Sequence, residues 1–412
     1  MPRLSAVTAA TENESGLLPT LLHKRVLAAA SLSVGAFALT YALVGPVLTS
    51  VMKTFGMDDA AGGFISGVMQ FGFFASALTG GYFADKLGMR RLMLLSTGML
   101  SAGAFLCAIS PNSVVLVAGL MAVGLGAGIV EGVGSALVNH VFEEKSAPAL
   151  NFVQAVFGVG ALTAPVLGAL VLRFADSWRL GFALCAAVSL VATLCQFILP
   201  KKTDGDHRLD LSIVKQLATD GGFLLLCLTL FLYVCGEMGC ASWISAFVER
   251  EQGLPKSLAA LTATLFWGGM LLGRIAYLRL TMTVKLTVLL KICALLAMGF
   301  IGAGIAVPKG WQSMVLFGLG GMALSGLWPT IVAVGGQWYA KYGATGTGVL
   351  VAVGGLGVIT MPYVIGLLSV SLGLRTAMYF DLPALLAVAA LMHWFERKHK
   401  AEARAALAEA PL

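Results

Sequence analysis

Three acidic residues, Glu131, Glu237 and Asp381, lie inside long apolar runs of the sequence. A charged side chain at the centre of a bilayer costs roughly 2.5–3.5 kcal/mol on insertion scales, so these carboxyls are candidates for function. Glu131 is the strongest candidate, because burial favours the uncharged carboxyl and lets such a group bind and release a proton. At about 100° per residue, its helix face also carries small or polar residues, namely Gly124, Gly128, Ser135 and Asn139. The alternative is a neutral Glu131 that only stabilises helix packing.

Glu237 lies in the stretch Gly236-Glu237-Met238-Gly239. The flanking glycines predict a locally unwound helix beside a cavity, where Glu237 would bind the hydroxyl groups of a solute or a cation. A hydrogen bond between packed helices is the alternative for Glu237. Asp381, near the start of the last apolar run, is assigned a structural role.

Aromatic rings and amide side chains can hold a small organic solute, and the apolar runs contain several of them. Beside Glu237 we take five as candidate solute ligands: Gln70, Asn151, Gln154, Trp243 and Trp328. Each has a structural alternative, since Trp is common at membrane interfaces and an amide can bond a neighbouring helix. The five histidines and seven cysteines show no metal-binding spacing, and the glycine cluster at 124–128 lies inside an apolar run rather than after a strand. The sequence therefore predicts no metal, no cofactor and no enzyme.

The elements that carry these residues are membrane-spanning helices. Of the 412 residues, 58% are hydrophobic and 11% are charged, against roughly 25% charged in typical globular chains. About 20 apolar residues span a bilayer as a helix, and the sequence contains twelve such runs, near 26–51, 61–84, 92–110, 113–138, 150–172, 179–199, 221–248, 257–278, 286–306, 311–336, 344–371 and 376–395. The net charge of +7 is thinly spread, so nucleic acid is not an expected partner. We expect a monomer in the lipid bilayer.

The distribution of Lys and Arg predicts the orientation. Most of the 27 basic residues fall in the tails and alternate loops that share one side with the N-terminus, which places both termini in the cytoplasm. We expect a plasma-membrane protein (the inner membrane of a bacterium). The predicted organisation is a tail at 1–24, a six-helix bundle at 25–199, a cytoplasmic linker at 200–220, a second six-helix bundle at 221–396 and a tail at 397–412.

The two halves of the sequence repeat. A G-x-G-x4-P pattern occurs twice, as Gly158, Gly160 and Pro165 in the fifth run and as Gly355, Gly357 and Pro362 in the eleventh. The glycines at 124–132 are matched in the same way at 318–326. Because each half has an even number of runs, duplicated halves point the same way across the membrane. Proline removes a helical hydrogen bond, so these six residues are predicted to let two helices bend.

Between the second and third runs the sequence reads Gly81-Tyr82-Phe83-Ala84-Asp85-Lys86-Leu87-Gly88-Met89-Arg90-Arg91. This stretch closely resembles the G-x-x-x-D-[R/K]-x-G-x-[R/K]-[R/K] signature of the major facilitator superfamily of transporters. The resemblance implies an all-α fold of twelve membrane helices in two parallel six-helix repeats. It also implies a cytoplasmic latch formed by Gly81, Asp85, Lys86, Gly88, Arg90 and Arg91; the alternative is that this loop only fixes topology. We expect Arg274, in the eighth run, to act in the same gate, paired within the cytoplasmic loops of the second half.

Within the superfamily, three stretches resemble the fucose-permease-like branch of proton-linked sugar symporters. These are 124–131, 150–160 and 233–243. The first run, unlike that of the branch's sugar permeases, has no acidic residue between Ala42 and Thr49. The resemblance implies a secondary transporter that moves a small organic solute, with a sugar or polyol favoured and a proton as coupling ion. Efflux of amphipathic compounds is the main alternative, and a membrane sensor or lipid-handling protein is the alternative from another class.

Overall fold

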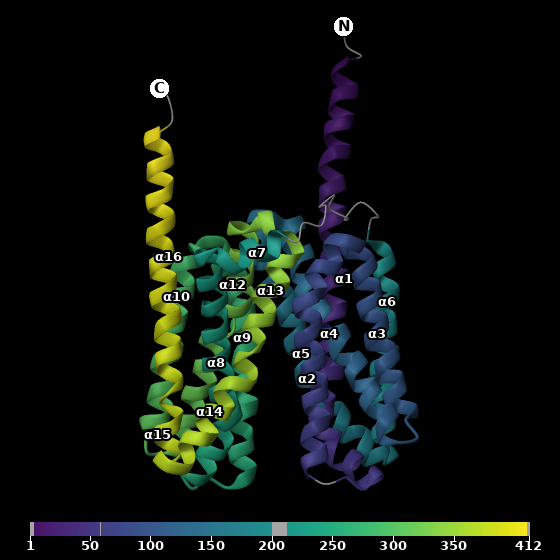
Figure 1. Cartoon of the computed structure of the whole chain (residues 1–412), viewed down its shortest axis with the longest axis vertical. Coiled ribbons are helices and arrows are strands. Elements are labelled where there is room, and N and C mark those ends of the chain that lie inside the picture. Colours follow the sequence, from purple (N-terminus) through teal and green to yellow (C-terminus); the bar gives the residue numbers. More distant parts are fainter. Residues whose placement is uncertain (1–3, 58, 200–211, 410–412) are drawn as a thin grey trace.

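The computed structural model describes residues 4–57, 59–199 and 212–409, and the described residues form helices without a strand. Figure 1 shows two groups of helices side by side. The first group, here called the N half, comprises α1 (Leu4–Phe55), α2 (Asp59–Leu87), α3 (Met89–Ile109), α4 (Ser113–Phe142), α5 (Ser146–Ala175) and α6 (Trp178–Cys195). The second, the C half, comprises α8 (Gly221–Arg250), α9 (Lys256–Thr283), α10 (Leu286–Ala306), α11 (Gly310–Leu324) with α12 (Leu327–Trp338), α13 (Gly343–Gly355) with α14 (Gly357–Leu372), and α15 (Leu374–Met378) with α16 (Asp381–Glu409).

The described residues contain ten segments that are long and apolar enough to cross a membrane, one of which, Ser113–Ala175, holds both α4 and α5. With α2, which packs along α4, they supply the twelve membrane helices that the sequence predicts. A short helix, α7 (Ser212–Thr219), precedes the C half. The rest of the predicted linker, 200–211, lies outside the described residues.

The first and last helices are longer than predicted. The helix α1 begins at Leu4 and α16 continues to Glu409, so both run through segments that we expected to be tails. Both segments are rich in Ala, Leu and Glu, which are strong helix formers, so the backbone continues beyond the apolar run. The two helices project from the same end of the molecule (Figure 1). We call it the terminal end and the other the opposite end.

The helix of the tenth span is interrupted between α11 and α12, and that of the eleventh between α13 and α14. At the first break Gly326 faces the ring of Tyr277 so closely that a Cβ atom there would lie 1.9 Å from it. The unwinding expected around Glu237 is not present, since α8 is one continuous helix. The flanking glycines have another cause: Gly236 makes room for Leu385 and Gly239 for Asp381, both on α16.

One close helix crossing occurs in both halves with the same geometry. A Cβ atom on Gly128 of α4 would lie 2.1 Å from the carbonyl oxygen of Phe73 on α2, and a Cβ atom on Gly321 of α11 would lie 2.3 Å from that of Phe266 on α9. Gly321 and Phe266 each follow their counterparts, Gly128 and Phe73, by 193 residues. Asn139 and Val332 are separated by the same interval and are joined by a hydrogen bond, so two equivalent positions of the repeat contact each other. The predicted repeat is therefore present as a repeated helix contact, at an interval one residue shorter than that between the matched glycines at 124 and 318.

This crossing gives a first testable prediction. Gly128→Ala forces a methyl group against the backbone of α2, and overpacking of this kind costs about 1–3 kcal/mol. We expect a lower midpoint of thermal unfolding for the purified protein in detergent. Gly299→Ala is the matched control, because a Cβ atom on this glycine of α10 would meet nothing within 4 Å. Equal midpoints for the two variants would contradict the tight crossing.

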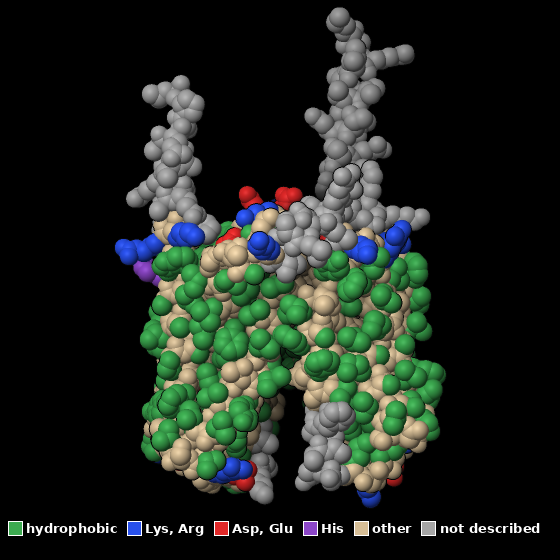
Figure 2. Space-filling model, in the orientation of Figure 1, with side chains coloured by type: hydrophobic (Ala, Val, Ile, Leu, Met, Phe, Trp, Pro, Cys, Tyr) green, Lys and Arg blue, Asp and Glu red, His purple; other side chains and the backbone are tan. Residues whose placement is uncertain are grey.

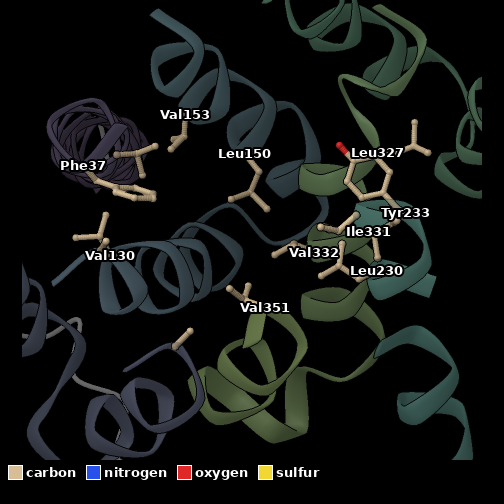
Figure 3. Packing of buried hydrophobic residues seen from close by; sticks show 14 of the residues in the cluster. Phe37, Val130, Leu150, Val153, Leu230, Tyr233, Leu327, Ile331, Val332 and Val351 are labelled. Atoms are coloured by element: carbon tan, nitrogen blue, oxygen red, sulfur yellow. The ribbon is translucent and has the colours of Figure 1, made fainter. Parts of the chain in front are cut away.

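The two halves meet over part of their height only. Buried side chains of both halves form one hydrophobic cluster: Val130 and Val153 lie around Phe37 within the N half, and Leu150 lies towards Val332 and Val351 of the C half (Figure 3). The α2–α13 contact lies towards the terminal end, where Gly81 meets Ala344 and Ala77 meets Gly348. Figure 2 shows the surface hollowed between the two halves at the opposite end. The molecule is closed at the terminal end and open at the opposite end.

Candidate proton and solute site

The carboxyl group of Glu131 lies at the meeting point of the two halves. Along α4 it is roughly 27 Å from Ser113 and 17 Å from Phe142 at 1.5 Å per residue, so it is nearer the closed terminal end. The residue is 4% exposed. Its Oε1 atom accepts a hydrogen bond from Nε2 of Gln154 on α5 at 2.7 Å and another from Nε1 of Trp328 on α12 at 2.9 Å. One donor therefore comes from the N half and the other from the C half.

Arg274 of α9 lies close to this group, because it bonds the backbone of Gln154. Its guanidinium is buried and donates from Nη1 to the carbonyl oxygen of Gln154 at 2.7 Å, and from Nε to that of Ser325 at 3.4 Å. The charged carbon Cζ lies 5.6 Å from the ring centre of Phe157, a cation–π distance. This differs from our expectation of a pairing within the loops, because the helix crossings carry Arg274 inward to the interface.

Glu237 lies in the C half, 5% exposed on α8. It is close enough to Arg274 and to Tyr233, one turn earlier on α8, to interact with both. Arg274 interacts electrostatically with Glu131 as well. The buried Arg274 cation therefore interacts with one carboxyl of each half. The contact between Tyr233 and Glu237 could have been predicted from the sequence, because residues four apart share a helix face.

An aromatic cluster lies beside this charged group in the N half. Phe37 contacts Tyr41, Phe73 and Phe157, with ring centres 5.4, 5.9 and 5.5 Å apart. Phe37 is buried, and the other three rings are partly exposed. A Cβ atom on Gly355, at the break between α13 and α14, would lie 3.6 Å from the ring of Phe73. These rings are not among the site residues predicted from the sequence, although Phe37 and Tyr41 are one helical turn apart.

The family model described as Major Facilitator Superfamily matches residues 30–322, more than half of the chain. The chain belongs to the major facilitator superfamily. The solved structures similar to this superfamily member include the E. coli fucose:proton symporter, also solved in the outward conformation, at TM-score 0.79 and 19% identity over 89% of this chain and 98% of the other. The proton:xylose symporter aligns at TM-score 0.73 and 13% identity, over 91% of this chain and 96% of the other.

Among curated sequences, the human sodium-dependent glucose transporter 1 is 22% identical over 266 residues, which cover 56% of this chain. The alignment spans about half of that transporter, 51% of its length. These matches confirm the predicted twelve-helix fold and a place among membrane transporters.

The superfamily signature lies at the terminal end, where α2 meets α13. The Asp85 carboxylate accepts hydrogen bonds from the backbone N–H groups of Ala344 at 3.3 Å and Thr345 at 3.1 Å, and from the Thr345 hydroxyl. These N–H groups belong to the first turn of α13, where a helix dipole attracts an anion. Gly88 has a φ of 91°, which glycine adopts without strain, and it separates α2 from α3. Of the remaining signature residues, Lys86 and Arg91 are exposed, and Arg90 donates to the carbonyl oxygen of Phe197.

Amide side chains form further contacts between the halves towards the terminal end. Asn139 donates to the carbonyl oxygen of Val332 at 3.1 Å, and Asn151 donates to the Thr330 hydroxyl at 3.3 Å. Asn139 and Asn151 are both buried. The structure therefore places Asn151 in the closed interface rather than at the solvent-exposed face of the cleft.

The other predicted site residues are more scattered. Trp243 donates to the carbonyl oxygen of Pro362 at 3.0 Å and so joins α8 to α14. Gln70 is half-buried on α2. The eleventh span breaks between Gly355 and Gly357, whereas α5 runs without interruption through Gly158, Gly160 and Pro165.

Asp381 is fully buried at the start of α16. Both carboxyl oxygens lack a hydrogen-bond partner among the described residues. A Cβ atom on Gly239 would lie 2.1 Å from one of these oxygens, so the carboxyl packs directly against α8.

Proposed function

We propose that this protein is a proton-coupled secondary transporter of a sugar or polyol, which works by alternating access. The observation that carries the proposal is the buried Glu131 carboxyl, bonded by Gln154 of one half and Trp328 of the other. A titratable group at the contact of two halves that must separate is suited to coupling a proton to that movement. The structural similarity to the fucose:proton and proton:xylose symporters supports the same class of solute and the same coupling ion.

The partly exposed rings beside the charged group suit such a solute. Tyr41, Phe73 and Phe157 offer aromatic faces for the C–H surface of a sugar ring. Glu237 and the Gln154–Glu131 pair supply hydrogen-bonding groups in the same layer. Gln70 and Trp243 are proposed as further contacts within the cleft.

We further propose that the terminal end faces the cytoplasm and that both termini lie there, in the plasma membrane. The excess of Lys and Arg on that side supports the orientation. In this orientation the cleft opens outward. The Asp85–Thr345 contact, with Gly81, Gly88 and the basic residues of the same loop, then acts as the cytoplasmic latch of the outward-open state. The monomer is proposed as the transporting unit.

The test is transport by the purified protein in liposomes. A panel of radiolabelled hexoses, 6-deoxyhexoses, pentoses and alditols is offered with an alkaline interior, with a sodium gradient and with no gradient. We expect one class of solute to accumulate above its external concentration under the pH gradient only, and a protonophore to abolish this accumulation.

Two outcomes would contradict the proposal. Accumulation driven by sodium alone would exclude the proton as coupling ion. Transport of amphipathic compounds with no transport of any sugar or polyol would favour the efflux alternative.

A further inference from the structure

The two hydrogen bonds to Glu131 end on one oxygen atom. Gln154 Nε2 and Trp328 Nε1 both donate to Oε1. An indole N–H and an amide NH₂ group can donate but not accept at nitrogen. Oε1 must therefore remain an acceptor, and a proton that binds Glu131 in this state binds Oε2.

Protonation changes the strength of both bonds. A hydrogen bond to a charged carboxylate is roughly twice as strong as one between neutral groups. The Gln154 bond lies within the N half, so its weakening leaves the halves in place. The Trp328 bond joins the halves. Its weakening removes part of what holds the interface closed.

Arg274 provides a second contact of this kind. It belongs to the C half and bonds the Gln154 backbone in the N half. The ion pairs found among the described residues do not include Arg274, yet it interacts electrostatically with Glu131 across the interface and with Glu237 in its own half. When Glu131 is charged, the attraction acts across the interface. When Glu131 is protonated, only the attraction to Glu237 remains, and it acts within the C half.

We propose that Trp328 and Arg274 are positioning residues that couple proton binding at Glu131 to opening of the terminal end. The inference rests on the proposed function, and it assigns Trp328 to the proton site rather than to the solute. The deprotonated carboxylate holds the terminal end closed through both residues. The protonated carboxyl releases both, so the halves separate at that end when the proton is bound.

The charged and titratable groups around Glu131 are few in the described part of the chain. Arg274 of α9 is the charged group that acts on Glu131. Tyr233 and Glu237 of α8 act on Arg274 in turn. The helices α1, α2, α3, α5, α12 and α13, which pack around α4, add no charged group to this set among the described residues. A pH dependence of the closed interface is therefore assigned to Glu131.

The first test measures solute exchange and pH-gradient-driven accumulation in liposomes between pH 5 and 8. Trp328→Phe keeps an aromatic ring but removes the donor, so we expect accumulation to fall about tenfold while exchange continues with a flattened pH profile. Arg274→Met has the same expected effect, and Arg274→Lys, which keeps the charge, restores the profile in part. Trp311→Phe and Arg279→Met, at exposed positions, are the controls.

Double variants separate coupling from a general structural defect. In a Glu131→Gln background the carboxylate charge that interacts with Trp328 and Arg274 is absent. Adding Trp328→Phe or Arg274→Met to this background is therefore expected to change the pH profile no further. Additive losses, or single variants with the wild-type pH profile, would overturn the inference. Either result leaves the proposed function intact if the wild-type protein still accumulates sugar under the pH gradient.

A second measurement needs no solute. Spin labels at Phe197→Cys and Lys285→Cys, exposed positions at the terminal ends of the two halves, report the distance between the halves once the native cysteines are replaced. We expect a longer distance at pH 5 than at pH 8 in the otherwise wild-type protein, and the longer distance at both pH values in Trp328→Phe. A distance that does not depend on pH in the first protein would refute the coupling.

Discussion

Glu131→Gln is expected to lower pH-gradient-driven accumulation by more than tenfold, to the level of passive equilibration. Glutamine has the shape of glutamic acid and keeps an oxygen that can accept from Gln154 and Trp328. Glutamine cannot release a proton, so the site no longer alternates between a protonated and a deprotonated carboxyl. We expect exchange of labelled for unlabelled solute to continue, and its rate to lose its dependence on pH. Accumulation and exchange in the same liposomes are the two measurements.

Glu144→Gln is the matched control, because Glu144 is an exposed carboxylate of the same half. It is expected to accumulate solute like the wild-type protein. Full accumulation by Glu131→Gln would remove this residue from proton coupling. Loss of both exchange and accumulation, with a lower unfolding midpoint, would instead identify Glu131 as a structural residue.

Gly81→Ala is expected to have the largest effect on the conformational equilibrium. A Cβ atom at Gly81 would lie 2.2 Å from the carbonyl oxygen of Ala344, a backbone atom of the other half. The two helices must move apart to accept the methyl group, and such overpacking costs about 1–3 kcal/mol. Because the clash exists only while the terminal end is closed, its full cost disfavours the closed state. A cost of this size changes the ratio of the two states by roughly 5- to 150-fold.

The same spin-label pair, at residues 197 and 285, measures this shift as a larger fraction of the longer distance. Gly98→Ala on α3 is the control, because a Cβ atom there would meet nothing within 4 Å. We also expect weaker binding of any solute that enters from the cleft side, since the competent state is less populated. An unchanged distance distribution in Gly81→Ala would contradict the close approach of α2 and α13.

The sequence was sufficient for the fold because membrane helices leave a strong and local signal. Each apolar run must satisfy its own backbone as a helix, so run length and Lys/Arg position carry most of the information. The positions of helix breaks depend on contacts with other helices and are therefore harder to predict from the sequence. The break at Gly326 depends on the ring of Tyr277, which lies on another helix. The continuity of α8 through Gly236 and Gly239 likewise depends on α16, whose side chains occupy the space that these glycines leave.

The same reason limits the prediction of the site. Residue type and helix face single out Glu131 in the sequence, and residue type alone makes Gln154 a candidate solute ligand. The bond from Trp328 and the inward position of Arg274 depend on how the two halves face each other. The sequence carries no short-range signal of that arrangement.

The interrupted tenth span has a consequence for the charge at the interface. In an uninterrupted helix the carbonyl oxygen of Ser325 would accept from the N–H group four residues later, but that residue is Pro329, which has none. The vacant acceptor is the one to which Arg274 donates from Nε. Arg274 thus bonds a carbonyl oxygen that proline leaves without its helical donor, in addition to its shorter bond to the carbonyl oxygen of Gln154. The carbonyl oxygen of Ser325 is therefore available to the guanidinium of Arg274. Any residue other than proline at position 329 would have an N–H group that competes for this oxygen.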